Sequence, residues 1–71
     1  MITEIGIAAG DIWHYLDESG KVKLSEIAMD INKERDLLLM SLGWLAREGH
    51  VKVDEVNGDY EVALTQPRVK E

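Results

Sequence analysis

The residue types that most often carry chemistry are scattered along this chain and form no catalytic or ligand-binding pattern. His14 and His50 stand alone in a chain without cysteine, whereas a metal site needs three or four ligands. Ser19, Ser25 and Ser41 have no histidine–carboxylate pair that the sequence places beside them, and there is no glycine-rich phosphate loop. We therefore expect no catalytic residue, no cofactor and no bound metal, and a protein that is not an enzyme.

The charged residues argue against a nucleic-acid surface. The 71 residues include 14 acids and 8 bases, for a net charge of −6. Acids outnumber bases in each of the segments 1–23, 24–51 and 52–65, and only the tail 66–71 is basic. Lysine and arginine supply most of the non-specific attraction to DNA phosphates, so DNA binding is possible but disfavoured. The acidic pairs Asp17-Glu18 and Asp54-Glu55 are expected to be solubilising surface charge.

The composition predicts one small cytoplasmic domain. The start Met1-Ile2-Thr3-Glu4 has no basic leader, and the longest apolar run, Leu37 to Met40, is too short to span a membrane. A chain of this length buries only about 60% of the surface that it exposes when unfolded. A partner or a second copy would therefore contribute a large share of the stability, so self-association is considered from the start.

The elements that must position any site begin with a helix. Thr3 is the expected N-cap, with Ile2 and Ile7 placed to form a hydrophobic staple across it. Gly20 is suited to the left-handed position after the last turn. The buried stripe is predicted at helical spacing, in Ile5, Ala8, Ala9, Ile12 and Leu16.

Two glycines interrupt this helix. In a helix interior, Gly6 and Gly10 each lower the stability by roughly 1 kcal/mol relative to alanine. The lack of a side chain at these positions should therefore serve a structural purpose. They are four residues apart and share one face. Two explanations stay open at this point: tight packing within the domain, or the close approach of another helix at an interface.

A short strand and two more helices follow. Lys21–Leu24 alternates polar and apolar residues, which indicates a strand, and Ser25 is the expected cap of the next helix. Asn32 permits a tight turn, and the third helix is predicted from Lys33 or Glu34 to Glu48, with Gly49 ending it. The inward positions of the two helices are predicted to be Ile27, Ala28, Ile31, Leu38, Leu42 and Leu45.

A β-hairpin completes the predicted domain. Asn57-Gly58, the strongest short signal for a two-residue turn, separates apparent strands over 50–56 and 59–65. The implied register places Val51 opposite Leu64, Val53 opposite Val62, and Glu55 opposite Tyr60. We predict an α+β domain over residues 1–65, in the order α-β-α-α-β-β, and a flexible C-terminal tail over 66–71.

Residues 12–65 resemble the winged helix-turn-helix superfamily, especially regulators of the type seen in arsenic- and multidrug-responsive repressors. The match runs without a gap from Ala28 to Val51, and the segment LAREGHV, 45–51, resembles the passage that leads such domains into the wing. The segments GIAAGDIW and SLGWLAREG also resemble a family of small stand-alone bacterial and archaeal winged-helix domains of unknown function. The resemblance implies three helices and a small antiparallel sheet with a C-terminal wing. Function does not follow, because the superfamily includes DNA readers, RNA binders and protein-interaction modules.

The sequence departs from the DNA-reading members at the positions that would face the duplex. In those members the position after the turn is apolar and the following outward positions are polar or basic. Here they are Lys33, Arg35, Asp36, Leu37, Leu39, Met40 and Gly43. Direct readout needs donors and acceptors aimed at base edges, and among the outward positions of the helix only Arg35 supplies cationic donors. The wing is two residues long and acidic, and Asp54 is predicted to face Glu61, which is a mildly unfavourable pair.

These departures predict a non-catalytic, regulatory binding module that acts through an apolar face of the third helix. Because the hairpin and the first helix must cover part of this surface, Trp44 is expected in the core. Leu39 and Met40 are harder to bury. The candidate contact residues are Leu37, Leu39, Met40, Gly43 and Trp44. The expected partner is a second copy, forming a homodimer, or another protein. The competing hypothesis is a DNA-binding transcription regulator that uses Lys33, Arg35, Arg47 and Lys52.

Overall fold

The computed structural model describes residues 1–66 and confirms the predicted order of elements. The predicted tail is 66–71, and most of it, residues 67–71, lies outside the described part of the chain. Its flexibility therefore stays a prediction. The elements are α1 (Ile2–Ser19), β1 (Val22–Lys23), α2 (Leu24–Ile31), α3 (Arg35–Arg47), β2 (Val51–Val56) and β3 (Asp59–Leu64).

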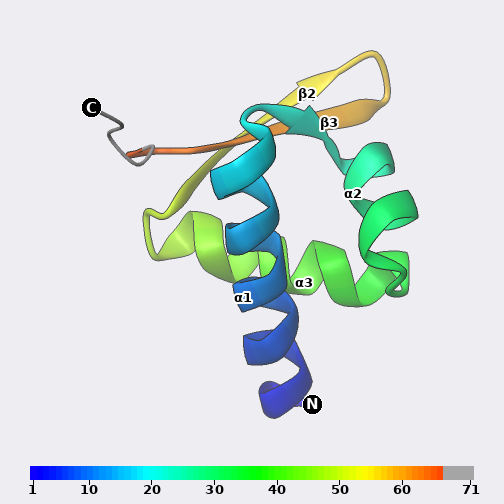
Figure 1. Cartoon of the computed structure of the whole chain (residues 1–71), viewed down its shortest axis with the longest axis vertical. Coiled ribbons are helices and arrows are strands. Elements are labelled where there is room, and N and C mark those ends of the chain that lie inside the picture. Colours follow the sequence, from blue (N-terminus) through cyan, green and yellow to red (C-terminus); the bar gives the residue numbers. More distant parts are fainter. Residues whose placement is uncertain (67–71) are drawn as a thin grey trace.

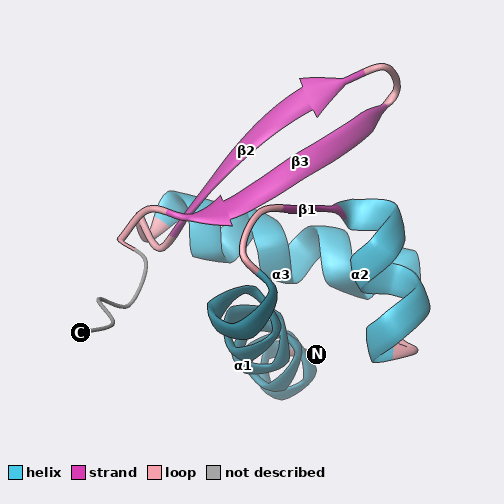
Figure 2. Ribbon diagram, turned by 45° about the horizontal axis from the view of Figure 1, so that its top comes forward, coloured by secondary structure: helices cyan, strands magenta, loops and turns pink. Residues whose placement is uncertain are grey.

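The molecule has a helical layer covered by one small antiparallel sheet (Figure 2). The strand order is β1-β3-β2, so the hairpin is extended by the short strand that follows α1. In Figure 1, α1 crosses α3, and the N-terminal turns of α1 extend beyond the crossing. The core between the layers consists of Ala9, Ile12, Leu16, Leu24, Ile27, Leu38, Leu42, Leu45, Val51, Val62 and Leu64.

The predicted inward faces of the helices are largely confirmed. Leu38, Leu42 and Leu45 of α3 are buried, as are Ile12 and Leu16 of α1. Three residues predicted to be inward, Ile5, Ala28 and Ile31, are only half-buried. Because a chain this short has few residues to bury, the edges of each helical stripe remain partly open to solvent.

The hairpin has the predicted register. Val51 lies opposite Leu64, Val53 opposite Val62, and Glu55 opposite Tyr60. The turn residues Asn57 and Gly58 have φ values of 53° and 79°, as the tight hairpin turn requires. The unfavourable pairing of Asp54 with Glu61 is also present.

The predicted start of α1 is wrong. The helix begins at Ile2 with Met1 as its N-cap, because the Ile5 amide donates to the Met1 carbonyl at 3.0 Å and closes the first turn. Thr3 therefore lies inside the helix and cannot cap it. Ile2 and Ile7 are 87% and 57% exposed, so they bury little surface as a staple. Gly20 has the predicted positive φ, 77°, but its ψ of −150° places it in a region that is nearly exclusive to glycine.

The predicted start of α2 is also wrong. Lys23 is the N-cap, and its amide donates to the Glu26 carboxylate at 3.0 Å, which satisfies one free donor of the first turn. Leu24 consequently belongs to the helix, and the strand shrinks to two residues. Ser25 does not cap the helix, because its hydroxyl donates to Asp59 at the start of β3.

The turn between α2 and α3 and the end of α3 follow the sequence closely. Asn32 is left-handed, with φ 62° and ψ 50°. The helix α3 starts at Arg35, one to two residues later than predicted, and ends at Arg47, one residue earlier. The amides of Gly49 and His50 donate to the carbonyls of Ala46 and Leu45, which is the Schellman arrangement that favours glycine here.

Candidate interaction surface

The candidate contact residues of α3 lie at the surface to different degrees. Leu39 and Met40 are 36% and 42% exposed, as the sequence predicted, and Gly43 is exposed. Leu37 is half-buried. Trp44 was expected in the core, and this was wrong, since it is 50% exposed. It lies on the flank of α3 that faces the N-terminal turns of α1, where Gly6 offers no side chain to cover it.

Trp44 joins α3 to α1 in a shallow apolar groove. One hollow, of about 330 Å³, is lined by Ile2, Ile5, Gly6 and Trp44. A second, of about 280 Å³, continues along α1. Its lining is Gly6, Ala9, Gly10, Trp13, Trp44, Leu45 and His50. We call the two hollows together the α1–α3 groove; no carboxylate, lysine or arginine lines it.

The two glycines of α1 are not needed for packing within the domain. A Cβ atom built at Gly6 or at Gly10 meets nothing within 4 Å. Tight packing inside the domain, one of the two explanations left open by the sequence, is therefore wrong. The interface explanation stays a prediction.

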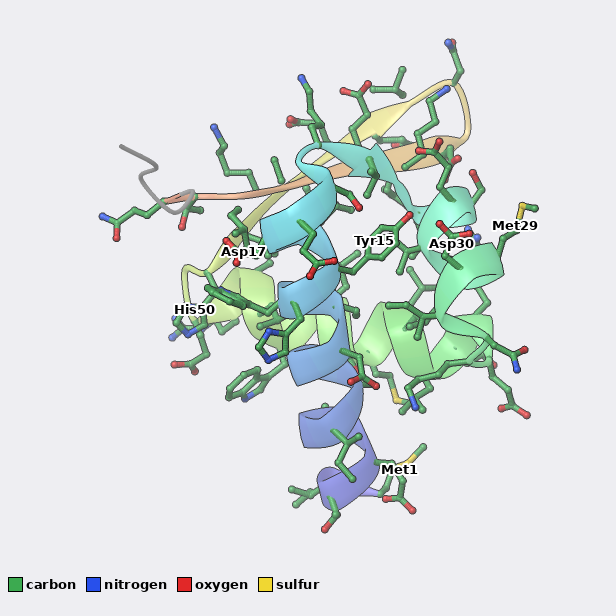
Figure 3. The ribbon with its side chains drawn as sticks, viewed as in Figure 1. Met1, Tyr15, Asp17, Met29, Asp30 and His50 are labelled. Carbon is green, nitrogen blue, oxygen red and sulfur yellow. The ribbon has the colours of Figure 1, made fainter. Side chains whose placement is uncertain are left out.

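The histidines have aromatic neighbours. The ring of His14 lies edge-on to Trp13 at 5.4 Å, and the ring of His50 lies 6.5 Å from that of Trp44. Figure 3 shows His50 beyond the end of α3. Within residues 1–66, no group of three histidine, cysteine or acidic side chains is placed to hold a metal ion.

The bases of the competing DNA hypothesis are not brought together. Lys33 pairs with Asp11 of α1 at 3.6 Å and is half-buried. Arg35 and Arg47 are the first and last residues of α3, about 18 Å apart along a helix of this length. Lys52 lies on the outer face of the sheet. The four side chains form no continuous basic ridge.

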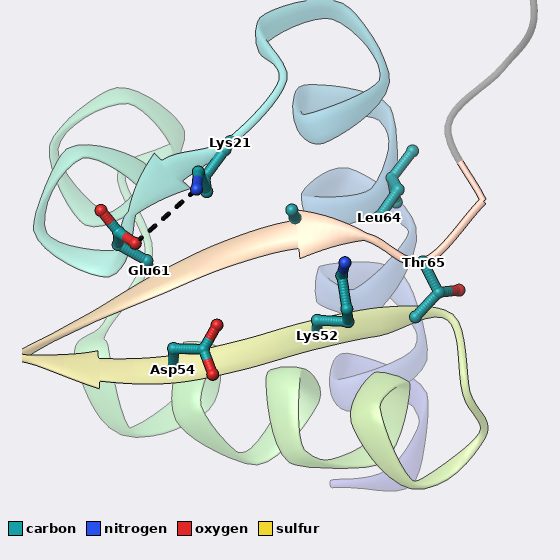
Figure 4. Close-up of a pocket in the computed structure, with 7 residues that line it drawn as sticks. Lys21, Lys52, Asp54, Glu61, Leu64 and Thr65 are labelled. Carbon is teal, nitrogen blue, oxygen red and sulfur yellow. Dashed lines mark ion pairs between the residues drawn. The ribbon is translucent and has the colours of Figure 1, made fainter.

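The outer face of the sheet has a hollow of mixed charge (Figure 4). Its volume is about 360 Å³, and its lining includes Lys21, Lys52, Asp54 and Glu61. Lys21 and Glu61 form an ion pair at 3.9 Å. Since bases and acids alternate across this face, it presents no field of one sign to a phosphate backbone.

Three polar contacts shift the pKa of a titratable group, and each has a structural role. The Tyr15 hydroxyl donates to Asp30 at 2.5 Å, which ties α1 to α2 and raises the pKa of Tyr15 (Figure 3). The Ser25 hydroxyl donates to Asp59 at 2.7 Å and lowers the pKa of that carboxyl. The terminal amino group, 3.0 Å from Glu4, lowers the pKa of Glu4.

These ties were not predicted, because their partners are far apart in the sequence or depend on where a helix starts. Ser41 of α3 is fully buried, and its hydroxyl donates to the Leu37 carbonyl at 2.8 Å. Sequence reasoning also missed Ile2 and Trp13 as groove residues. The available signal was the spacing Ile2, Gly6, Gly10, Trp13, which places all four on one face of α1.

Residues 1–66 contain no helix that is both long and apolar enough to cross a lipid bilayer.

A three-helix domain with a helix-turn-helix and a C-terminal hairpin is a winged helix-turn-helix protein. The chain belongs to the family described as "Winged helix-turn-helix domain (DUF2582)", whose model matches residues 1–64.

The chain is also similar to two individual proteins. The uncharacterized protein MJ1608 of Methanocaldococcus jannaschii is 42% identical over 53 residues, which cover 70% of this chain and 74% of that protein. The solution NMR structure of protein BT2368 from Bacteroides thetaiotaomicron superposes with a TM-score of 0.76 at 32% identity, covering 87% of this chain and 76% of that chain. The structural match supports the fold, and neither name states an activity.

Proposed function

We propose that this chain is a non-catalytic regulatory module that uses its exposed α3 surface for apolar contact with protein. The observation that carries the proposal is the exposure of Leu39, Met40 and Trp44 on the helix that DNA-reading relatives present to the major groove. Contiguous exposed apolar side chains mark binding sites more often than isolated ones do.

The charge distribution supports protein contact over duplex DNA. The two bases of α3 stand at its opposite ends, and Asp36 follows directly after Arg35. The wing carries Asp54 and Glu61 on the same face as Lys52. Without clustered cations, the chain lacks the counterion-release term that dominates DNA affinity.

The test is a substitution that charges the surface without touching the core. Met40→Asp should raise the dissociation constant for self-association by roughly tenfold or more, because a buried carboxylate at a contact is costly. Met29→Asp is the matched control, since Met29 is 82% exposed on α2 and points away from α3 (Figure 3). Sedimentation equilibrium measures the association, and circular dichroism checks that both variants fold.

The rival function, a DNA-binding transcription regulator using Lys33, Arg35, Arg47 and Lys52, has a different signature. It requires duplex binding that falls steeply with salt and is unaffected by Met40→Asp. Fluorescence anisotropy with a labelled duplex at low and moderate salt, on a sample of known oligomeric state, measures this. That pattern, combined with unchanged association of Met40→Asp, would replace the proposed function by the rival one.

A further inference from the structure

We infer that the chain associates with a second copy of itself. In this dimer α1 of one copy packs antiparallel against α1 of the other, with Gly6 and Gly10 at the crossing. The inference rests on the proposed function in taking association to be apolar. It goes further by naming the partner and by placing the centre of the interface on α1.

The first observation is that one face of α1 is uncharged over residues 3–14; the next position on that face, Asp17, is half-buried near the end of the helix. Residues 3, 6, 7, 10 and 14 follow each other at helical spacing and are all exposed, and they are Thr, Gly, Ile, Gly and His. The nearby acids Glu4 and Asp11 lie further round the helix, and each has a cationic partner within the chain. In a chain of net charge −6, an uncharged face lowers the repulsion between two copies.

The second observation is that the N-terminal turns of α1 are a helix with little to pack against. They extend past α3 in Figure 1, and Ile2 and Ile7 are largely exposed. Isoleucine, threonine and glycine are weak helix formers, and a helix of such residues depends on tertiary packing for its stability. A second helix laid along these turns would supply that packing.

The third observation is that the surface carries both a projecting side chain, Ile2, and a hollow, the one that Trp13 and Trp44 line. A two-fold interface requires such self-complementarity, because the same patch meets itself. An antiparallel pair centred between Gly6 and Gly10 brings Ile2 of each copy to the level of Trp13 and His14 of the other. The hollow lined by Gly10, Trp13 and Trp44 lies there. The glycines let the two helix axes approach closely, since no Cβ stands between them.

Charge complementarity favours the antiparallel direction. The C-terminal end of α1 carries the exposed acid Glu18 and has no base in its last turn, although a helix C-terminus favours cations. An antiparallel copy brings the positive end of its own α1 toward this acid. A parallel copy would place acids beside acids.

The experiment measures sedimentation equilibrium of the full chain over a wide concentration range. Gly10→Leu should raise the dimer dissociation constant roughly tenfold or more, because the added side chain occupies the crossing. Met29→Asp is again the control, since Met29 is 82% exposed on α2 and belongs neither to α1 nor to the candidate contact residues of α3. Its dissociation constant should stay within about twofold of the wild-type value.

Each outcome is informative. A loss of dimer with Gly10→Leu but not with Met29→Asp supports the α1 crossing. A loss with Met40→Asp but not with Gly10→Leu overturns the inference while leaving the proposed function in place. A loss with Gly10→Leu but not with Met40→Asp keeps the α1 dimer and contradicts the proposed α3 surface. A wild-type chain that remains monomeric at roughly millimolar concentration overturns the inference outright.

Discussion

Single side chains tie the elements of this small domain together where the core does not reach. Asp59 accepts hydrogen bonds from the Ser25 hydroxyl at 2.7 Å and from the Tyr60 amide at 2.8 Å, and this links the start of α2 to the hairpin. Tyr15 and Asp30 make a similar link between α1 and α2. Each link includes a titratable carboxyl group, so its strength depends on pH.

We predict that Ser25→Ala raises the pKa of Asp59 toward its ordinary value, because the Ser25 hydroxyl is the main cause of the depression. A depressed carboxyl pKa stabilises the fold above the unfolded value of about 3.9 and stops doing so as pH falls through the folded value. The variant should therefore lose stability at neutral pH and differ less from wild type in strong acid. Carboxyl-detected NMR titration measures the pKa.

Glu4 is the internal control for this titration, since its pKa is lowered by the terminal amino group and not by Ser25. Its midpoint should be the same in both proteins. An Asp59 midpoint that does not move in Ser25→Ala would contradict the assigned cause.

At the scale of elements, the sequence predicted what periodicity and turn chemistry determine. The buried stripe of α3, the Asn57-Gly58 turn and the strand register all appear as predicted. The starts of α1 and α2 were predicted wrongly because neither helix begins at the expected hydroxyl cap. The Met1 carbonyl accepts the first helical hydrogen bond of α1, and the Lys23 amide donates to Glu26 at the start of α2. The position of Trp44 could not be predicted, since its exposure depends on where α1 crosses α3.

Two glycines at the end and in the middle of α3 should respond oppositely to alanine. Gly49 has φ of +82°, so Gly49→Ala should destabilise the domain by about 1–2 kcal/mol. Gly43 is helical with open space around it, so Gly43→Ala should stabilise by up to about 1 kcal/mol. Thermal unfolding of dilute protein measures both, and about 4–8 °C per kcal/mol is expected for a domain of this size. Shifts of the same sign would contradict the assigned backbone roles.

At the scale of the whole molecule, the winged helix-turn-helix fold is combined with a charge pattern that does not suit a duplex. The bases are separated or paired with acids, as Lys33 is with Asp11 and Lys21 with Glu61. The uncharged surface instead continues from α3 across Trp44 to the glycines of α1. The same architecture that presents a reading helix to DNA in some relatives would here present an apolar surface to protein.

The most direct test follows the ¹H–¹⁵N NMR signals of the chain while it is diluted. The indole N–H of Trp44 and the amides of Gly6 and Gly10 should shift together with one dissociation constant, because all three lie on the α1–α3 groove. Duplex DNA added at moderate salt should leave the spectrum unchanged. Signals that are independent of protein concentration, together with DNA-induced shifts at Arg35 and Arg47, would contradict the account.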